Sequence, residues 1–257
     1  MKQAERGTFL SSRARWRSKF KPEGNKMTQE EYKAKFKEDD AVGWDAIDTA
    51  LAKIYDKSKE RHYVSTLPAR IGGEDHLDGV SIFDCDEQTF HRHIISFGMS
   101  ELYYEPESAG KDFSRWGFEF TMRVVPFALD RDGKNPDGSV VKNELHWVNN
   151  VMLNLARYVD KSGKWFEAYH FIPANSPIRL DTDTKLVGFA FAPDPVLGSI
   201  DTPNGKVDFL QMVGITQSEL DWLLQDPKTT RVKQLINKMC ADNPLLITNL
   251  TRAREYV

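Results

Sequence analysis

The segment WGFEFTMRVV, residues 116–125, constrains the fold more than any other part of the chain. Large apolar side chains alternate strictly with small or polar ones along it. The first set is Trp116, Phe118, Phe120, Met122 and Val124, and the second set is Gly117, Glu119, Thr121 and Arg123. Because successive side chains of a strand point to opposite faces, this alternation predicts a β-strand with one buried face. The other face is predicted to be in water or covered by polar groups.

Helices and further strands are predicted on both sides of this segment. Capping-box spacings at residues 28–31 and 216–219 each mark the start of a helix. Predicted helices cover residues 28–36, 43–54, 141–159, 216–224 and 231–239, and predicted strands cover 77–83, 91–97, 186–191 and 207–215. Pro, Gly and Asp-Gly steps predict loops at residues 130–139 and 193–206. Since strands and helices come in runs rather than in strict alternation, the predicted fold class is α+β, a mixed β-sheet flanked by helices.

Composition excludes several classes of protein. With 40% hydrophobic and 11% aromatic residues, the 257-residue chain has enough apolar side chains for a core and is not of a disordered or collagen-like type. No apolar run reaches the roughly 18 residues of a transmembrane helix, and the N-terminal region lacks the pattern of a secretory signal. Cys85 and Cys240 are far apart and fit no disulfide or zinc pattern, which predicts reduced thiols and a cytoplasmic protein.

Charge is distributed unevenly along the chain. Residues 1–26 carry eight Lys or Arg and two Glu, a net of +6, which leaves −9 for residues 27–257 out of the total of −3. An acidic body repels nucleic acid and favours basic partners. The basic segment, which includes Trp16 and Phe20, is interpreted first as a disordered, solvated tail. Two alternatives stay open: an arm that binds nucleic acid or an anionic membrane, and a translation start at Met27.

A pair of histidines is the strongest ionisable cluster. No nucleotide-binding glycine motif and no GxSxG motif occurs in the chain. His91 and His93 are two residues apart on a predicted strand, so both side chains leave the same face, which suits a metal. This gives a metal-dependent hydrolase as the alternative function, whereas structural histidines are the simpler interpretation. Further ligands would come from Asp78, Asp84, Asp86 or Glu119.

Other residues point to acid–base chemistry or to binding. Glu119, on the polar side of the central strand, is a candidate general base if the sheet lines a cleft; otherwise it faces solvent or pairs with Arg123. Tyr103 and Trp116 flank the mixed-charge loop 105–115, and aromatic side chains beside a loop suit a protein-binding surface. Membership of the core is an equal alternative for Trp116.

Eight short motifs, taken in order, resemble the Suppressor of Fused domain. They are GWDAID at 43–48, HY at 62–63, LDGVSIF at 77–83, ISFGMSELY at 95–103, WGFEFTMRV at 116–124, NLARYV at 154–159, TPNGKVDFLQMVGIT at 202–216 and LLITN at 245–249. Each motif is weak alone, but their order over residues 27–254 is specific. The resemblance implies that residues 27–257 form a single Suppressor of Fused-like domain after the tail of residues 1–26.

The resemblance also implies a function. In the animal protein a second domain follows, and a peptide of the Gli transcription factors adds as a strand in the cleft between the two. Because this chain ends where the first domain would end, Gli binding is not carried over. Single-domain members are similar to bacterial proteins, some of them thought to be immunity proteins that neutralise partner toxins. An acidic body fits such a role, since nuclease toxins tend to be basic.

The expected function is therefore a non-enzymatic, intracellular protein-binding domain. It is predicted to act as an immunity protein that neutralises a basic toxin by capturing a peptide or an edge strand. The resemblance implies no catalytic residue and no cofactor, and we expect neither a membrane, nucleic acid nor a small-molecule substrate as partner.

The resemblance points to particular binding residues. Tyr103 matches the tyrosine that ends the family's SFG-x-S-x-LY motif and helps to form the Gli-peptide site. Asp112 lies near the family's peptide-contacting aspartate, and Lys111 is the alternative there because the loop before WGFEF differs in length. The predicted partner-binding residues are thus Tyr103, Asp112 and Trp116.

Overall fold

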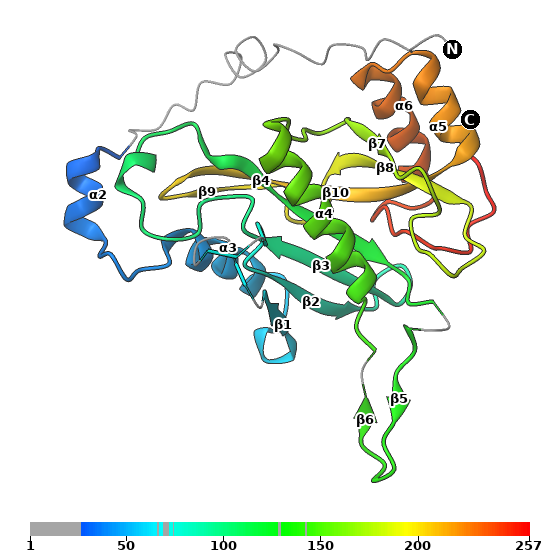
Figure 1. Cartoon of the computed structure of the whole chain (residues 1–257), viewed down its shortest axis with the longest axis horizontal. Helices are drawn as coiled ribbons and strands as arrows, with labels where there is room; N and C mark the ends of the chain where they lie inside the picture. The colour runs from blue at the N-terminus through cyan, green and yellow to red at the C-terminus, as the bar shows by residue number, and fades with distance from the viewer. Residues whose placement is uncertain (1–26, 66, 69–71, 74, 128–129, 142) are drawn as a thin grey trace.

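A computed structural model describes residues 27–257 apart from 66, 69–71, 74, 128–129 and 142 (Figure 1). The predicted tail at residues 1–26 thus lies outside the described residues. The described helices are α2 (Gln29–Lys35), α3 (Val42–Ala52), α4 (His146–Ser162), α5 (Gln217–Gln225) and α6 (Thr229–Cys240), with 3₁₀ turns η1 (Lys57–Lys59) and η3 (Pro106–Ser108). None of the described helices has the length and apolar character that a membrane span requires.

An eight-stranded mixed sheet forms the centre of the protein. Its strands lie in the order β1-β2-β3-β4-β10-β8-β7, and β9 also pairs with β10. Every paired neighbour is antiparallel except β4 and β10, which run parallel. The strands are β1 (Arg61–Val64), β2 (Gly79–Cys85), β3 (His91–Phe97), β4 (Phe113–Val124), β7 (Phe171–Pro173), β8 (Leu186–Pro193), β9 (Ser199–Thr202) and β10 (Gly205–Thr216). This mixed sheet with its helices confirms the predicted α+β class.

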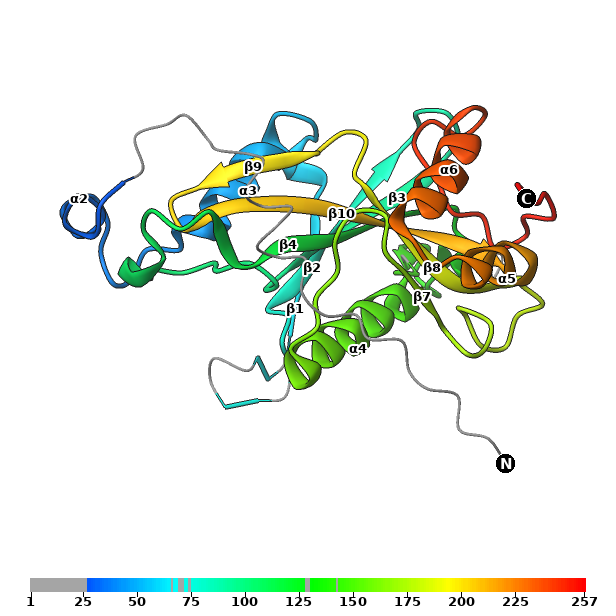
Figure 2. The same cartoon turned by 90° about the horizontal axis from the view of Figure 1, so that it is seen from above.

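The apolar face of β4 packs against α4, as the alternation predicts. Figure 2 shows α4 on one side of the sheet and α3 and α6 on the other. Each fully buried side chain of this size contributes about 1.5–3 kcal/mol to folding, so this layer is a major part of the core. The buried cluster includes Phe118, Phe120, Met122 and Val124 of β4 and Leu145, Val148, Met152, Leu155 and Val159 at α4, and Trp116 packs against its edge.

The opposite face of the sheet is covered as well. At one end Ile47 and Leu51 of α3 pack on Phe97 and Phe209, and at the other end α5 and α6 pack on the ends of β8 and β10. Between these two apolar clusters the polar side chains of β4 and β10 are buried. The second face of the central strand is therefore covered by polar groups and is not in water.

Helix ends follow the local sequence closely. Thr28 with Glu31 and Thr216 with Glu219 form reciprocal capping boxes at the starts of α2 and α5, as predicted. The long helix α4 begins at His146, later than predicted, and Gly163 ends it with a φ of +65°. Helix α3 ends at Ala52, which leaves the predicted helical residue Ile54 39% exposed.

Two segments predicted to be loops contain strands. Residues 193–206 were predicted from Pro and Gly content to be wholly loop, and this is wrong: Ser199–Thr202 forms β9. Thr202 pairs with Gly205, so Pro203 occupies the hairpin turn, where a missing N–H is harmless. Residues 130–139 are largely exposed, as predicted, but two-residue strands β5 (Gly133–Lys134) and β6 (Val140–Val141) pair there into a hairpin that extends from the body (Figure 1).

Candidate functional site

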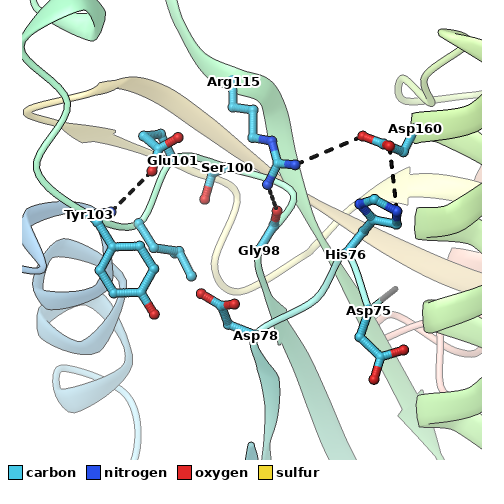
Figure 3. Close-up of a pocket in the computed structure, with 10 residues that line it drawn as sticks. Asp75, His76, Asp78, Gly98, Ser100, Glu101, Tyr103, Arg115 and Asp160 are labelled. Atoms are coloured by element: carbon cyan, nitrogen blue, oxygen red, sulfur yellow. Dashed lines mark hydrogen bonds and ion pairs between the residues drawn. The ribbon is translucent and has the colours of Figure 1, made fainter. Parts of the chain in front are cut away.

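A pocket lies where β3 ends and β2 begins, between the loop after β3 and the C-terminal end of α4 (Figure 3). Its cavity volume is about 400 Å³. Residues distant in the chain form its walls: Asp75, His76, Asp78, Gly98, Ser100, Glu101, Leu102, Tyr103, Arg115 and Asp160. A space of this size accepts a side chain or a short extended segment of a partner.

A single buried carboxylate shapes the loop beneath this pocket. The carboxylate of Glu119 accepts hydrogen bonds from the hydroxyls of Ser96 and Ser100, both at 2.6 Å. It also accepts three backbone N–H bonds, from Gly98 at 3.0 Å, Met99 at 3.3 Å and Ser100 at 2.9 Å. Burial raises the pKa of Glu119, and the bonds from Ser100 and Ser96 act in the opposite direction. Glu119 therefore neither faces solvent nor pairs with Arg123, and both of its oxygens are occupied by these donors.

Two residues with left-handed backbone set the shape of the pocket. Gly98 has a φ of +133°, and a Cβ there would lie 2.9 Å from backbone atoms of His76 and Asp78. Arg115 has a φ of +47°, which is uncommon for a residue with a side chain. Its Nη1 donates to the carbonyl of Gly98 at 2.7 Å. The glycine lets its loop approach residues 76–78, and the arginine ties the same loop to the start of β4.

Among the described residues that line the pocket, carboxylates outnumber cations. Asp75, Asp78, Glu101 and Asp160 line it together with Arg115 and His76. Nη2 of Arg115 lies 3.9 Å from Asp160, and Nε2 of His76 lies 3.5 Å from the same carboxylate, so both contacts are long. Burial raises the pKa of Glu101 because its charged form is poorly solvated there, and a cation placed beside it would offset that cost. The pocket thus has the electrostatic character of a site for a basic group.

The structure separates the three predicted binding residues. Tyr103 lines the pocket, on the side opposite His76 and Asp160 (Figure 3). Asp112 is exposed on the loop before β4, and its carbonyl accepts the backbone N–H of Lys206 at 3.2 Å. Trp116 is half-buried against the core, and its backbone N–H donates to Met99. Neither Asp112 nor Trp116 is among the residues that line this cavity.

Sequence reasoning missed several residues of the pocket. Arg115 lies in β4 directly before Trp116, and only its positive φ distinguishes it from other surface arginines. Asp160 comes from the last turns of α4 and approaches the pocket through the packing of that helix on the sheet. Asp78 lies within the LDGVSIF segment, where it had been considered only as a metal ligand. No local spacing links these three positions.

The two predicted metal-ligating histidines have separate structural partners. Nδ1 of His93 lies 2.6 Å from the Tyr55 hydroxyl, and Nε2 lies 3.0 Å from Asp194 in a poorly aligned contact. Nδ1 of His91 lies 2.8 Å from the carbonyl of Thr89. In the described part of the chain no group of three or more His, Cys, Asp or Glu side chains is arranged to hold a metal. The geometry therefore favours the structural interpretation of the pair.

These histidines border a buried polar network. Nη1 of Arg123 donates to Asp194 at 2.7 Å and to the side chain of Gln211, and the hydroxyl of Thr121 donates to Asp194 at 2.8 Å. Burial alone would raise the pKa of Asp194, but His93 and Arg123 hold it below its ordinary value. Burial also raises the pKa of Tyr55, so its hydroxyl stays protonated and is able to donate to Nδ1 of His93.

Comparisons with known proteins decide the family. The family model for the Suppressor of fused protein (SUFU) matches residues 73–253. The chain belongs to the Suppressor of Fused family. The Suppressor of fused homologs of human and mouse are each 31% identical over 191 residues, which make up 71% of this chain. The matched region is only 37% of each of these two proteins, so the chain corresponds to part of their length.

Solved structures of Suppressor of Fused proteins share the fold. The crystal structure of the Sufu–Fu complex matches with a TM-score of 0.72 at 28% identity, covering 84% of this chain and 93% of that one. Drosophila Suppressor of Fused matches with a TM-score of 0.71 at 28% identity, covering 84% of this chain and 51% of that one. A putative SUFU homolog from Neisseria gonorrhoeae, at 16% identity and a TM-score of 0.52, agrees in fold alone. The Sufu–Fu complex shows that Sufu binds a protein partner.

Proposed function

We propose that this chain is a non-enzymatic protein-binding domain that captures an extended segment of a partner at the pocket beside Tyr103. The observation that carries the proposal is the position of Tyr103 on the wall of a pocket of about 400 Å³. Family membership supports it, because Sufu forms a complex with the protein Fu. The donor set around His91 and His93 offers no comparable support for a hydrolase.

Among the described strands, β1 forms an edge of the sheet, and its C-terminal end lies at the same end of the sheet as the pocket. Strand β1 pairs with β2 on one side and ends the sheet on the other. The N–H of Ser65 donates to the carbonyl of Asp78, so in the antiparallel register His62 and Val64 direct their backbone groups away from β2. The side chain of Val64 is 72% exposed. A partner strand added to β1 would pair with the backbone of His62 and Val64, and its continuation past Val64 would run toward the end of the sheet at which the pocket lies.

The charge of the domain supports a basic partner. Residues 27–257 carry a net charge of −9, and carboxylates dominate the pocket. Complementary charge raises the rate of encounter and selects against acidic competitors. In its specific form, the proposal is that the protein is an immunity protein that neutralises a basic toxin. Asp112, exposed on the loop before β4, and Trp116 are proposed to lie at the margin of the contact.

Affinity purification of the tagged 257-residue chain from its native host tests the proposal. Mass spectrometry is expected to identify one stoichiometric basic partner. Tyr103→Ala is expected to lose this partner, whereas Tyr158→Ala, an exposed tyrosine on α4 that is not among the residues lining the pocket, is expected to retain it. Retention by Tyr103→Ala, or the absence of any stoichiometric partner over several growth states, would contradict the proposal.

The part played by the sheet edge has its own test. Val64→Pro removes an N–H that points away from β2, so it should leave the β1–β2 pairing in place and abolish pairing with a partner strand. Val64→Thr keeps the N–H and is the matched control. Affinity for the identified partner should fall about tenfold or more in the proline variant alone. Equal affinity in both variants would place the partner away from this edge.

A further inference from the structure

A second charged surface lies at the other end of the molecule from α2, on α6 beside the C-terminus (Figure 1). The exposed side of this helix carries three cations, two amides and no carboxylate, although residues 27–257 as a whole are acidic. We call this surface the α6 basic face. It consists of Arg231, Lys233, Gln234, Asn237 and Lys238.

Aromatic rings, and not carboxylates, hold its cations. Arg231 lies over Trp222 at 4.4 Å, Lys238 lies over the same ring at 5.7 Å, and Lys233 lies over Tyr169 at 5.5 Å. Among the described residues none of these three cations forms an ion pair with a carboxylate. In each contact the charged group itself lies over the ring face, which attracts the cation without cancelling its net charge.

Backbone carbonyls fix two of these cations further. Nη1 of Arg231 donates to the carbonyl of Trp222, and Nζ of Lys238 donates to the carbonyl of Tyr256 at 3.0 Å. These bonds leave the positive charges uncompensated and reduce the number of conformers that binding would have to restrict. The face is therefore preorganised for an anionic group.

Three carboxylates in this part of the protein are engaged by other groups. Asp242 accepts from Arg254 and from the hydroxyl of Tyr256 at 2.9 Å, and Asp226 lies 3.7 Å from Lys228. Glu219 is buried and accepts from Arg252. None of these acids is paired with the three cations of the α6 basic face.

We propose that the α6 basic face binds an acidic segment of a protein partner. Helix α6 has twelve residues, which gives a face about 18 Å long. A nucleic acid longer than this would extend over a body whose net charge is −9 and would be repelled. Proteins that bind single strands also present open aromatic faces for base stacking, whereas here Arg231 and Lys238 cover Trp222. A short run of Asp and Glu meets neither obstacle.

Fluorescence anisotropy on the full-length protein tests this inference. The probe is a labelled peptide of about twelve residues, mostly Asp and Glu, and the competing probe is single-stranded oligothymidine of about 20 nucleotides. The peptide is expected to bind with an affinity that falls as salt rises. Lys233→Glu/Lys238→Glu is expected to weaken peptide binding by about tenfold or more.

Matched controls separate a local effect from a change in net charge. Lys33→Glu/Lys53→Glu reverses two exposed charges elsewhere and should change peptide affinity by less than about twofold. Tyr103→Ala should leave it unchanged, because the two surfaces are independent. The inference is overturned if both double variants weaken binding equally, if the oligonucleotide binds more tightly than the peptide, or if the peptide does not bind.

Discussion

Ser100 is joined to Glu119 twice: its hydroxyl and its backbone N–H donate to the same carboxylate oxygen, at 2.6 and 2.9 Å. Ser100 lines the pocket, whereas Glu119 is buried in the middle of β4. The central strand therefore sets the position of the loop at which we expect a partner to bind. A carboxylate that resembles a general base in the sequence instead receives five hydrogen bonds and organises a binding loop.

Replacing Glu119 should destabilise the whole domain. Glu119→Gln places an NH₂ group among donors and leaves several of them without an acceptor, so the free energy of unfolding should fall by about 3 kcal/mol. Urea denaturation measures this change. Glu87→Gln, on an exposed loop, is the control and should change stability by less than about 0.5 kcal/mol. Equal stabilities for the two variants would show that the carboxylate does not organise the loop.

His93 should make stability depend on pH. Burial and then the charge of Arg123 lower its pKa to about 4, whereas an unfolded histidine titrates near about 6.5. Between these values the unfolded chain binds more protons, so stability is complete above about pH 6.5 and falls as the pH drops to about 4. The pKa difference corresponds to about 3 kcal/mol. The contribution of Asp194, whose pKa is lowered, is lost at still lower pH, as the pH falls through its folded pKa.

Denaturation at a series of pH values, with His93→Gln beside the wild type, measures this dependence. The variant should lose stability less steeply between pH 6.5 and 4. His146→Gln, at an exposed position, should keep the wild-type slope. Burial also lowers the pKa values of His62, His91 and His170, which accounts for the slope that remains in His93→Gln. An unchanged slope in His93→Gln would disprove the assignment.

Arg252 should stabilise the C-terminal part of the domain. Its Nη1 and Nη2 donate to the two oxygens of Glu219 at 2.7 and 2.8 Å, and Nη2 also donates to the carbonyl of Gly214. The side chain of Glu219 is fully buried, so Arg252→Ala leaves an uncompensated charge and should lower the free energy of unfolding by about 3 kcal/mol. Arg254→Ala removes an exposed pair and should lower it by less than about 1 kcal/mol. Thermal and urea denaturation compare the two, and similar losses would contradict the difference in burial.

Neither cysteine should react readily in the native protein. Burial raises the pKa of Cys85 to about 11 and also raises that of the half-buried Cys240. Since the thiolate is the nucleophile, alkylation by iodoacetamide at pH 8 should be slow in the folded state, with Cys85 slower than Cys240, and fast in urea. Peptide mapping by mass spectrometry follows each site. Rapid labelling of Cys85 in the folded protein would mean that its surroundings open frequently.

Local patterns predicted most of the elements because their causes are local. The alternation in β4 reflects the two faces of a strand, and the capping boxes at Thr28 and Thr216 involve residues three positions apart. Strand β9 is missed by sequence reasoning that takes the prolines as a sign of a loop over all of residues 193–206. Pro203 in fact lies only in the turn that joins β9 to β10. The order of eight motifs identified the family, which the comparisons confirm.

The sequence by itself determined the class of fold and the family, since both depend on residue types and their order, and it predicts Tyr103 as a binding residue. Only the tertiary structure decided that Glu119 bonds to a loop, that Arg115 and Asp160 join Tyr103 in one pocket, and that the cations of α6 contact aromatic rings. The physical reason is that burial and pairing arise between segments far apart in the chain. Asp160 and Arg115 become neighbours only when α4 packs on the sheet, and no spacing in the sequence records that contact.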